Sequence, residues 1–170
     1  MPKNYWMAVQ TSEDFETTRD LGFTLHGMKR TQRRRAQRME PDDSILYYVS
    51  GLKKWTAIAM VTSKYYEDST PVWESQNGRS EAYPYRVKLK PYIVMEEESY
   101  IDALALAPRL DYIKRWPPER WPLAFVDTLH LLPQKDFRLI ETEMKRLHPS
   151  WRNKRRRGRN RKNRKNQSVS

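Results

Sequence analysis

Residues 45–62 read ILYYVSGLKKWTAIAMVT, in which two apolar runs flank a short polar stretch around Gly51. Runs of this length that are rich in Ile, Val, Tyr and Trp are typical of β-strands, and a glycine between them favours a turn. The pattern therefore predicts two strands, Ile45–Val49 and Trp55–Thr62, which are joined as a β-hairpin.

Further strands are predicted on both sides of this hairpin. Tyr5–Val9 is a short apolar run that suits a buried strand. Residues 85–90 alternate between apolar and basic side chains, which predicts a half-buried strand whose basic outer face includes Arg86. Pro91 weakens the end of this strand, and we expect Tyr92–Met95 to continue the chain extended on a sheet edge. The clearest helix is residues 134–147, with apolar side chains at helical spacing. These elements favour an α+β fold, a small twisted and mostly antiparallel β-barrel flanked by helices.

The composition excludes several classes of protein. The chain has 170 residues, of which 38% are hydrophobic and 32% charged, and it has no cysteine. Disulfide frameworks, thiol nucleophiles and thiolate zinc sites are therefore excluded. Because no run of eighteen apolar residues occurs and the N-terminus lacks a secretory pattern, we expect a soluble, intracellular and cytoplasmic protein, with a nucleoid or nuclear location as alternatives.

The positive charge is concentrated at one end of the chain. Lys and Arg number 33 against 21 Asp and Glu, and ten of the basic residues lie within residues 152–165, so the remainder has 23 basic and 21 acidic residues. We expect a folded domain over residues 1–149 and a disordered basic tail over residues 150–170. Such a tail favours polyanion binding, although a localisation address or a ribosome-contacting segment would have the same composition.

A second basic cluster lies inside the domain, where residues 29–39 are predicted to form a helix. Six cations occur in ten positions without an acidic residue, and like charges this close repel one another unless an anion is present. The cluster indicates either a solvated face or contacts to phosphates. The candidate phosphate-binding residues are Lys29, Arg30, Arg33, Arg34 and Arg38.

The sequence contains no recognisable catalytic or cofactor motif. Its three histidines are far apart, and no phosphate-binding glycine loop or nucleophile elbow is present. Glu96–Glu98 is interpreted as a charge run that precedes a helix rather than as a metal site. We therefore expect neither an enzyme nor a bound metal or cofactor.

Trp73 lies in a polar loop, EDSTPVWES, that spans residues 67–75. A large ring in such a loop either covers the core or offers a face to a flat ligand, and the sequence leaves both interpretations open. If the ring is a pocket wall, one of its faces is exposed and its loss should change stability little. Stacking of a nucleobase on an aromatic ring is worth roughly 1–3 kcal/mol.

Several motifs in the same order resemble those of the EVE domain, a member of the PUA-like superfamily that is related to YTH domains. The resemblance covers about residues 3–147, and it rests on the segments Tyr5–Val9, Ser12–Phe15, the Gly27 turn, Arg38–Asp43, Ile45–Gly51, Thr70–Trp73, Tyr83–Val87 and Pro133–Ile140. It implies a PUA-like barrel of five or six strands that reads a modified base in DNA or RNA. The base is flipped out of its strand into a pocket, and no cofactor is needed.

By position, the resemblance implies a pocket at the end of the first strand, the Gly27 turn and the Trp73 loop. Leu25 stands where related domains often have a second tryptophan, which implies a one-sided stack. The residues expected at this pocket are Val9, Gln10, Thr11, Leu25, His26, Gly27, Tyr48, Ser50 and Trp73. Two alternatives remain: a general RNA-binding protein associated with the ribosome or tRNA, without such a pocket, and an enzyme on the same fold. A cavity walled by Trp73 would favour the reader over the general binder.

Overall fold

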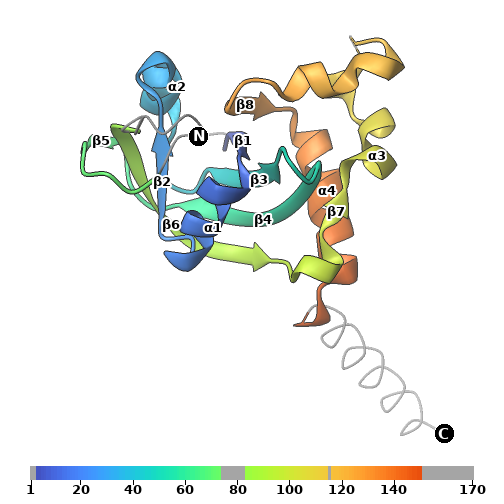
Figure 1. Cartoon of the computed structure of the whole chain (residues 1–170), viewed down its shortest axis with the longest axis horizontal. Helices are drawn as coiled ribbons and strands as arrows, with labels where there is room; N and C mark the ends of the chain where they lie inside the picture. The colour runs from blue at the N-terminus through green and yellow to red at the C-terminus, as the bar shows by residue number, and fades with distance from the viewer. Residues whose placement is uncertain (1–2, 74–82, 115, 151–170) are drawn as a thin grey trace, which may run out of the picture.

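The computed structural model describes residues 3–73, 83–114 and 116–150 (Figure 1). The predicted basic tail, apart from Ser150, lies outside the described residues. The helices and strands in chain order are β1 (Tyr5–Gln10), α1 (Ser12–Asp20), β2 (Leu25–Met28), α2 (Arg33–Arg38), β3 (Ser44–Val49), β4 (Lys54–Val61), β5 (Tyr66–Glu67), β6 (Tyr85–Val94), β7 (Ile101–Asp102), α3 (Ala103–Leu106), β8 (Leu129–Leu132) and α4 (Gln134–Leu147). Short 3₁₀ turns connect them at Arg30–Gln32, Glu97–Ser99, Ala107–Arg109, Asp111–Ile113 and Pro118–Phe125.

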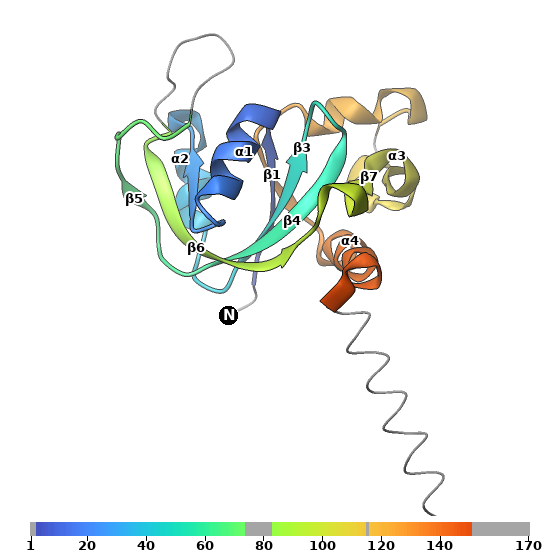
Figure 2. The ribbon, with the colours of Figure 1, turned by 60° about the horizontal axis from the view of Figure 1, so that its bottom comes forward.

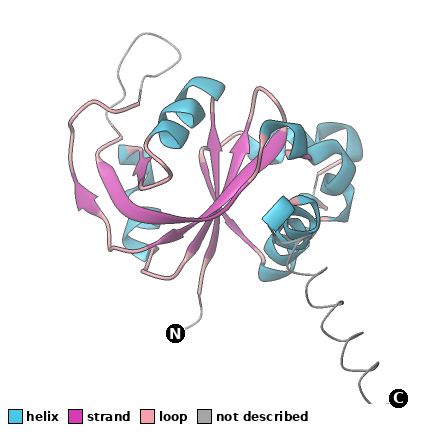
Figure 3. Cartoon of the chain, turned by 90° about the horizontal axis from the view of Figure 1, so that it is seen from below, coloured by secondary structure: helices cyan, strands magenta, loops and turns pink. Residues whose placement is uncertain are grey.

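The strands form one curled sheet in the order β2-β6-β4-β3-β1-β8, with β5 paired to β6 and β7 paired to β4. The β1–β3 pair is parallel, and the other pairs are antiparallel. Figure 3 shows that the sheet curls into a half-barrel with helices on two sides. The predicted α+β class, the mostly antiparallel barrel-like sheet and the β3–β4 hairpin are therefore confirmed.

The sheet is buried on both faces because its strands alternate their side chains between two apolar clusters. Along β1, Trp6 and Ala8 pack with α1 and β2, while Tyr5 and Met7 pack with α4 and the turns that precede β8. Figure 2 shows α1 on the concave side of the sheet, with α3 and α4 on the other side. The predicted apolar face of α4 is buried through Phe137, Ile140 and Met144.

Two sequence predictions need correction. The helix predicted over residues 29–39 is a 3₁₀ turn followed by the six residues of α2, because the buried Gln32 side chain bonds to Lys29 N–H and to Thr128 and closes the first turn tightly. The extended segment expected after Pro91 is confirmed, since β6 continues through Pro91 to Val94, and a register shift against β4 between Ile58 and Ala59 accommodates the missing N–H.

The second correction concerns Arg86, which the alternating pattern placed on an exposed face. Its side chain is 2% exposed, because the chain between β5 and Trp73 covers this end of β6: the guanidinium donates to the Thr70 carbonyl oxygen and pairs with the Asp68 carboxylate at 3.5 Å. No helix in the described part of the chain is long and apolar enough to span a membrane.

Candidate functional site

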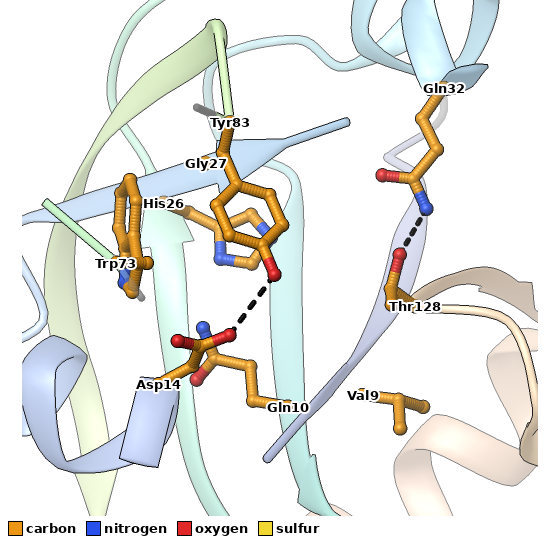
Figure 4. A pocket seen from close by; sticks show the side chains of 9 residues that line it. All are labelled: Val9, Gln10, Asp14, His26, Gly27, Gln32, Trp73, Tyr83 and Thr128. Carbon is orange, nitrogen blue, oxygen red and sulfur yellow. Dashed lines mark hydrogen bonds between the residues drawn. The ribbon is translucent and has the colours of Figure 1, made fainter. Parts of the chain in front are cut away.

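A small cavity lies where the end of β1, the start of α1 and the strand β2 meet the side chains of Trp73 and Tyr83 (Figure 4). It encloses about 20 Å³, which is room for about one water molecule. The residues that line it are Val9, Gln10, Asp14, His26, Gly27, Gln32, Trp73, Tyr83 and Thr128.

Short segments of the sequence place two walls of this cavity. Thr11 caps the N-terminus of α1 by accepting a hydrogen bond from Asp14 N, which places Asp14 in the first helical turn beside the end of β1. On the other side, Gly27 lies against aromatic rings: a Cβ at this position would lie 2.5 Å from Trp73 Cζ3 and 2.7 Å from Tyr83 Cβ. Only glycine therefore allows both rings to pack against β2 in this arrangement.

Trp73 forms a wall of the cavity and is also buried, with 3% of its surface exposed. Its Nε1–H donates to Thr18 Oγ1 at 3.0 Å, and its ring meets Tyr83 edge-on at 5.7 Å between centroids. The Arg86 guanidinium lies 5.4 Å from the ring centroid. The expectation of an exposed face on Trp73 is wrong because Arg86 and Gly27 both pack against the ring, and the small effect on stability that was expected from that face no longer follows.

Polar side chains close the rest of the cavity. The Tyr83 hydroxyl donates to Asp14 Oδ2 at 3.0 Å, as Figure 4 shows. At the opposite end, Gln32 donates to Thr128 and also to Asp127 Oδ1 at 3.3 Å. Gln10 Nε2 donates to Thr18 Oγ1 at 3.1 Å, while Gln10 Oε1 is buried and has no hydrogen-bond partner among the described residues. A water or a ligand donor in the cavity could satisfy this oxygen.

His26 is a buried histidine whose Nδ1 lies 3.0 Å from the Tyr47 hydroxyl. Burial lowers the pKa of His26 from 6.5 to about 4, because the charged imidazolium is poorly solvated there. The imidazole is therefore neutral near pH 7, with one donor and one acceptor nitrogen.

The lowered pKa of His26 predicts a loss of stability in mild acid. Above pH 6.5 the side chain is neutral in both states, whereas between pH 6.5 and about 4 only the unfolded state takes up the proton. We expect this group to remove about 2 kcal/mol from the free energy of unfolding by pH 5. Urea titrations at pH 7 and pH 5 would measure it. His26→Gln should lose that much less over the same range, since His130 and His148 remain in both proteins; equal losses would contradict the assignment.

The structure gathers five of the nine residues expected at the pocket. Val9, Gln10, His26, Gly27 and Trp73 line the cavity. The other four expected residues, Thr11, Leu25, Tyr48 and Ser50, do not line the cavity. Thr11 is the helix cap, Leu25 lies beside its lining neighbour His26 but is itself only half-buried, and Ser50 is exposed after β3.

Tyr48 is placed on the wrong face by the sequence argument. It packs edge-on against Phe125 at 5.0 Å between centroids, in the apolar cluster on the α4 side of the sheet. Its neighbour Tyr47 points to the other face and reaches His26. Adjacent strand residues face opposite sides, so an error of one position exchanges the two clusters.

Sequence reasoning missed Asp14, Gln32, Tyr83 and Thr128, which also line the cavity. Asp14 follows a helix cap at the usual spacing, which is a weak local signal. Thr128 lies 96 positions from its partner Gln32, and Tyr83 lies 69 positions from its partner Asp14. Nothing in a single sequence indicates such distant pairings.

The candidate phosphate-binding residues lie before and after the cavity-lining residue Gln32 along the chain. Arg33 and Arg34 follow Gln32, a lining residue, and their side chains are exposed, as are those of Arg30 and Arg38. In the described part of the chain these four arginines form no ion pair, and Lys29 is half-buried. By contrast, Arg35 pairs with Asp127 at 2.7 Å and donates to Leu129 O, so it attaches α2 to β8.

Residues 4–124 match the family model of the EVE domain. The chain belongs to the EVE domain family. The UPF0310 protein PH1033 of Pyrococcus horikoshii is 29% identical over 147 residues, which cover 81% of this chain and 96% of that protein. The resemblance to the EVE domain that the sequence predicts is thereby confirmed.

Solved structures share the EVE fold at low sequence identity. The YTH domain of the Zygosaccharomyces rouxii MRB1 protein, in complex with N6-methyladenosine RNA, has a TM-score of 0.58 and 12% identity, over 87% of this chain and 93% of that one. The YTH domain-containing protein mmi1, also in a complex with RNA, has a TM-score of 0.59 and 9% identity, over 84% of this chain and 82% of that one. At these identities the likeness shows a YTH-like fold.

Proposed function

We propose that this EVE domain protein binds DNA or RNA and reads one modified base, which is flipped out of its strand into the cavity beside Trp73. The observation that carries the proposal is the adjacency of two features: an aromatic-walled polar cavity and a row of exposed arginines, joined through Gln32. Structural neighbours that are solved with RNA, one of them with N6-methyladenosine RNA, support nucleic-acid binding by this fold.

The size of the cavity shows what binding must change. A nucleobase is several times larger than the single water molecule that 20 Å³ accommodates. The surrounding side chains must therefore move apart, and the hydrogen bond from Tyr83 to Asp14 is one of the two bonds between lining side chains in Figure 4. We expect this bond to open when a base enters, and the ring of Trp73 to remain as the stacking face.

The experiment that tests the function compares oligonucleotides that differ in one base. Fluorescence anisotropy would measure binding to matched RNA and DNA strands with N6-methyladenine, 5-methylcytosine, 5-hydroxymethylcytosine or the unmodified base. We expect at least a tenfold preference for one modified base, which corresponds to 1.4 kcal/mol. Equal affinities throughout would instead favour the general RNA-binding alternative, which needs only the exposed arginines. We propose binding without catalysis, so the recovered oligonucleotide should have an unchanged mass.

The arginines before and within α2 should contribute affinity without selectivity. Replacing Arg30, Arg33 and Arg34 together by glutamine removes up to three phosphate contacts, which position a strand but carry no base information. Affinity for modified and unmodified strands should fall by similar factors, and the slope of log affinity against log salt should become smaller by about two to three.

A control variant has the same net charge as the variant that lacks the three arginines. Replacing Lys90, Arg109 and Arg120 by glutamine removes the same charge from exposed positions outside α2 and the turn before it. This control should change the salt slope much less. If the arginine variant weakens only the modified strand, these arginines belong to the base pocket rather than to a phosphate surface.

A further inference from the structure

The Thr18 hydroxyl determines which way the Gln10 amide faces. Thr18 is buried, and its Oγ1 donates its single proton to the Asp14 carbonyl oxygen at 3.1 Å. Thr18 Oγ1 can then only accept further hydrogen bonds, and one of these comes from Trp73 Nε1–H. Gln10 must therefore turn its –NH₂ group toward Thr18, at 3.1 Å, which leaves Oε1 as the free end of the amide. That oxygen is buried and has no partner in the described part of the chain.

The Tyr47 hydroxyl determines the tautomer of His26 in the same way. Tyr47 is fully buried, and His26 Nδ1 is its hydrogen-bond partner among the described residues. If Nδ1 carried the imidazole proton, the Tyr47 hydroxyl would only accept, and its own proton would be buried without an acceptor. The phenol therefore donates to Nδ1. The neutral imidazole then carries its proton on Nε2, which has no hydrogen-bond partner in the residues that the structure describes.

We infer that the cavity has a fixed polarity, with an acceptor at Gln10 Oε1 and a donor at His26 Nε2–H, and that Thr18 and Tyr47 are the positioning residues that fix it. For the ligand this inference rests on the proposed function. It requires a neutral base whose edge presents a donor to Gln10 and an acceptor to His26, as the amino group and the adjacent ring nitrogen do in adenine and cytosine. A phosphodiester or a carboxylate has only acceptor atoms at neutral pH, so its oxygens would be repelled by the Gln10 oxygen.

The polarity can be measured without any ligand. Long-range ¹H–¹⁵N spectra of the labelled protein at pH 7 distinguish a protonated ring nitrogen from an unprotonated one. We expect His26 Nε2 to be the protonated nitrogen in the wild-type protein, and Tyr47→Phe to shift His26 toward a mixture of tautomers. A wild-type spectrum in which Nδ1 carries the proton would overturn the inference, whatever the protein binds.

Binding measurements then test whether the polarity is used. With the modified oligonucleotide that binds best as the probe, Thr18→Val and His26→Leu should each weaken binding about 5- to 50-fold and leave the salt slope unchanged. Thr18→Ser, which keeps the hydroxyl, should restore most of the affinity. Thr17→Val is the matched control, because the Thr17 hydroxyl bonds to Glu13 O on the same helix and does not contact Gln10.

The two hypotheses fail in different ways. If no strand of the panel binds preferentially, the proposed function fails, while the spectra still decide the polarity of the cavity. If one modified strand binds preferentially but Thr18→Val and His26→Leu bind it as well as the wild-type protein does, the reader function stands and the inferred polarity is overturned.

Discussion

Replacing Trp73 by alanine is expected to lower the free energy of unfolding by about 3–5 kcal/mol, as truncation of a buried tryptophan does. The side chain is 3% exposed, packs against the backbone of Gly27 and donates to Thr18. The variant also loses the stacking face, worth roughly 1–3 kcal/mol, so the folded fraction should bind the preferred modified base about 5- to 100-fold more weakly. Urea denaturation and anisotropy at a low temperature would measure both effects.

Trp121→Ala is the matched control for this experiment. Trp121 is buried in the apolar cluster on the α4 side of the sheet, where it packs edge-on against Phe125. We expect Trp121→Ala to lower the free energy of unfolding by a comparable amount, while the folded fraction of this variant binds the preferred modified base with wild-type affinity. If Trp73→Ala is destabilised equally and its folded fraction also binds normally, then Trp73 is a core residue alone and the base pocket is refuted.

Arg86→Met is expected to produce the second large effect and to lower the free energy of unfolding by about 2–3 kcal/mol, because it removes the hydrogen bonds of a charged donor. The guanidinium donates to the carbonyl oxygens of Thr70 and Tyr83 and lies over the Trp73 ring. Methionine keeps much of the apolar stem but leaves both carbonyl groups without this donor. Urea denaturation gives the stability, and the indole N–H resonance of Trp73 should shift as the ring loses its neighbour.

Lys88→Met is the control on the same strand. Lys88 is exposed two residues along β6, and its loss should change stability by no more than about 0.5 kcal/mol. A comparable effect of both variants would show that Arg86 contributes only as any strand residue does. We expect Arg86→Met to reduce the preference for the modified base and to leave the salt slope unchanged. The reason is that Arg86 packs on the Trp73 ring, which is a wall of the pocket, and is not expected to contact phosphates.

The architecture follows from patterns that are local in the sequence. The apolar runs at 45–49 and 55–62 become β3 and β4, and the helical spacing at 134–147 becomes α4 with the same bounds. These elements could be predicted because strand and helix periods repeat over a few residues and report directly which side chains are buried. The gathering of Gln10, His26, Gly27 and Trp73 at one site was predicted through the EVE resemblance, not through periodicity.

The sequence by itself therefore determined the fold class, the basic cluster beside β2 and part of the pocket. Only the tertiary structure decided that Arg86 is buried, that Tyr47 rather than Tyr48 reaches His26, and that four further residues complete the cavity, namely Asp14, Gln32, Tyr83 and Thr128. The physical reason is distance along the chain. Period and composition describe neighbours, whereas the partners that bury an arginine or orient an amide are brought together only when the sheet curls and its covering segments close over it.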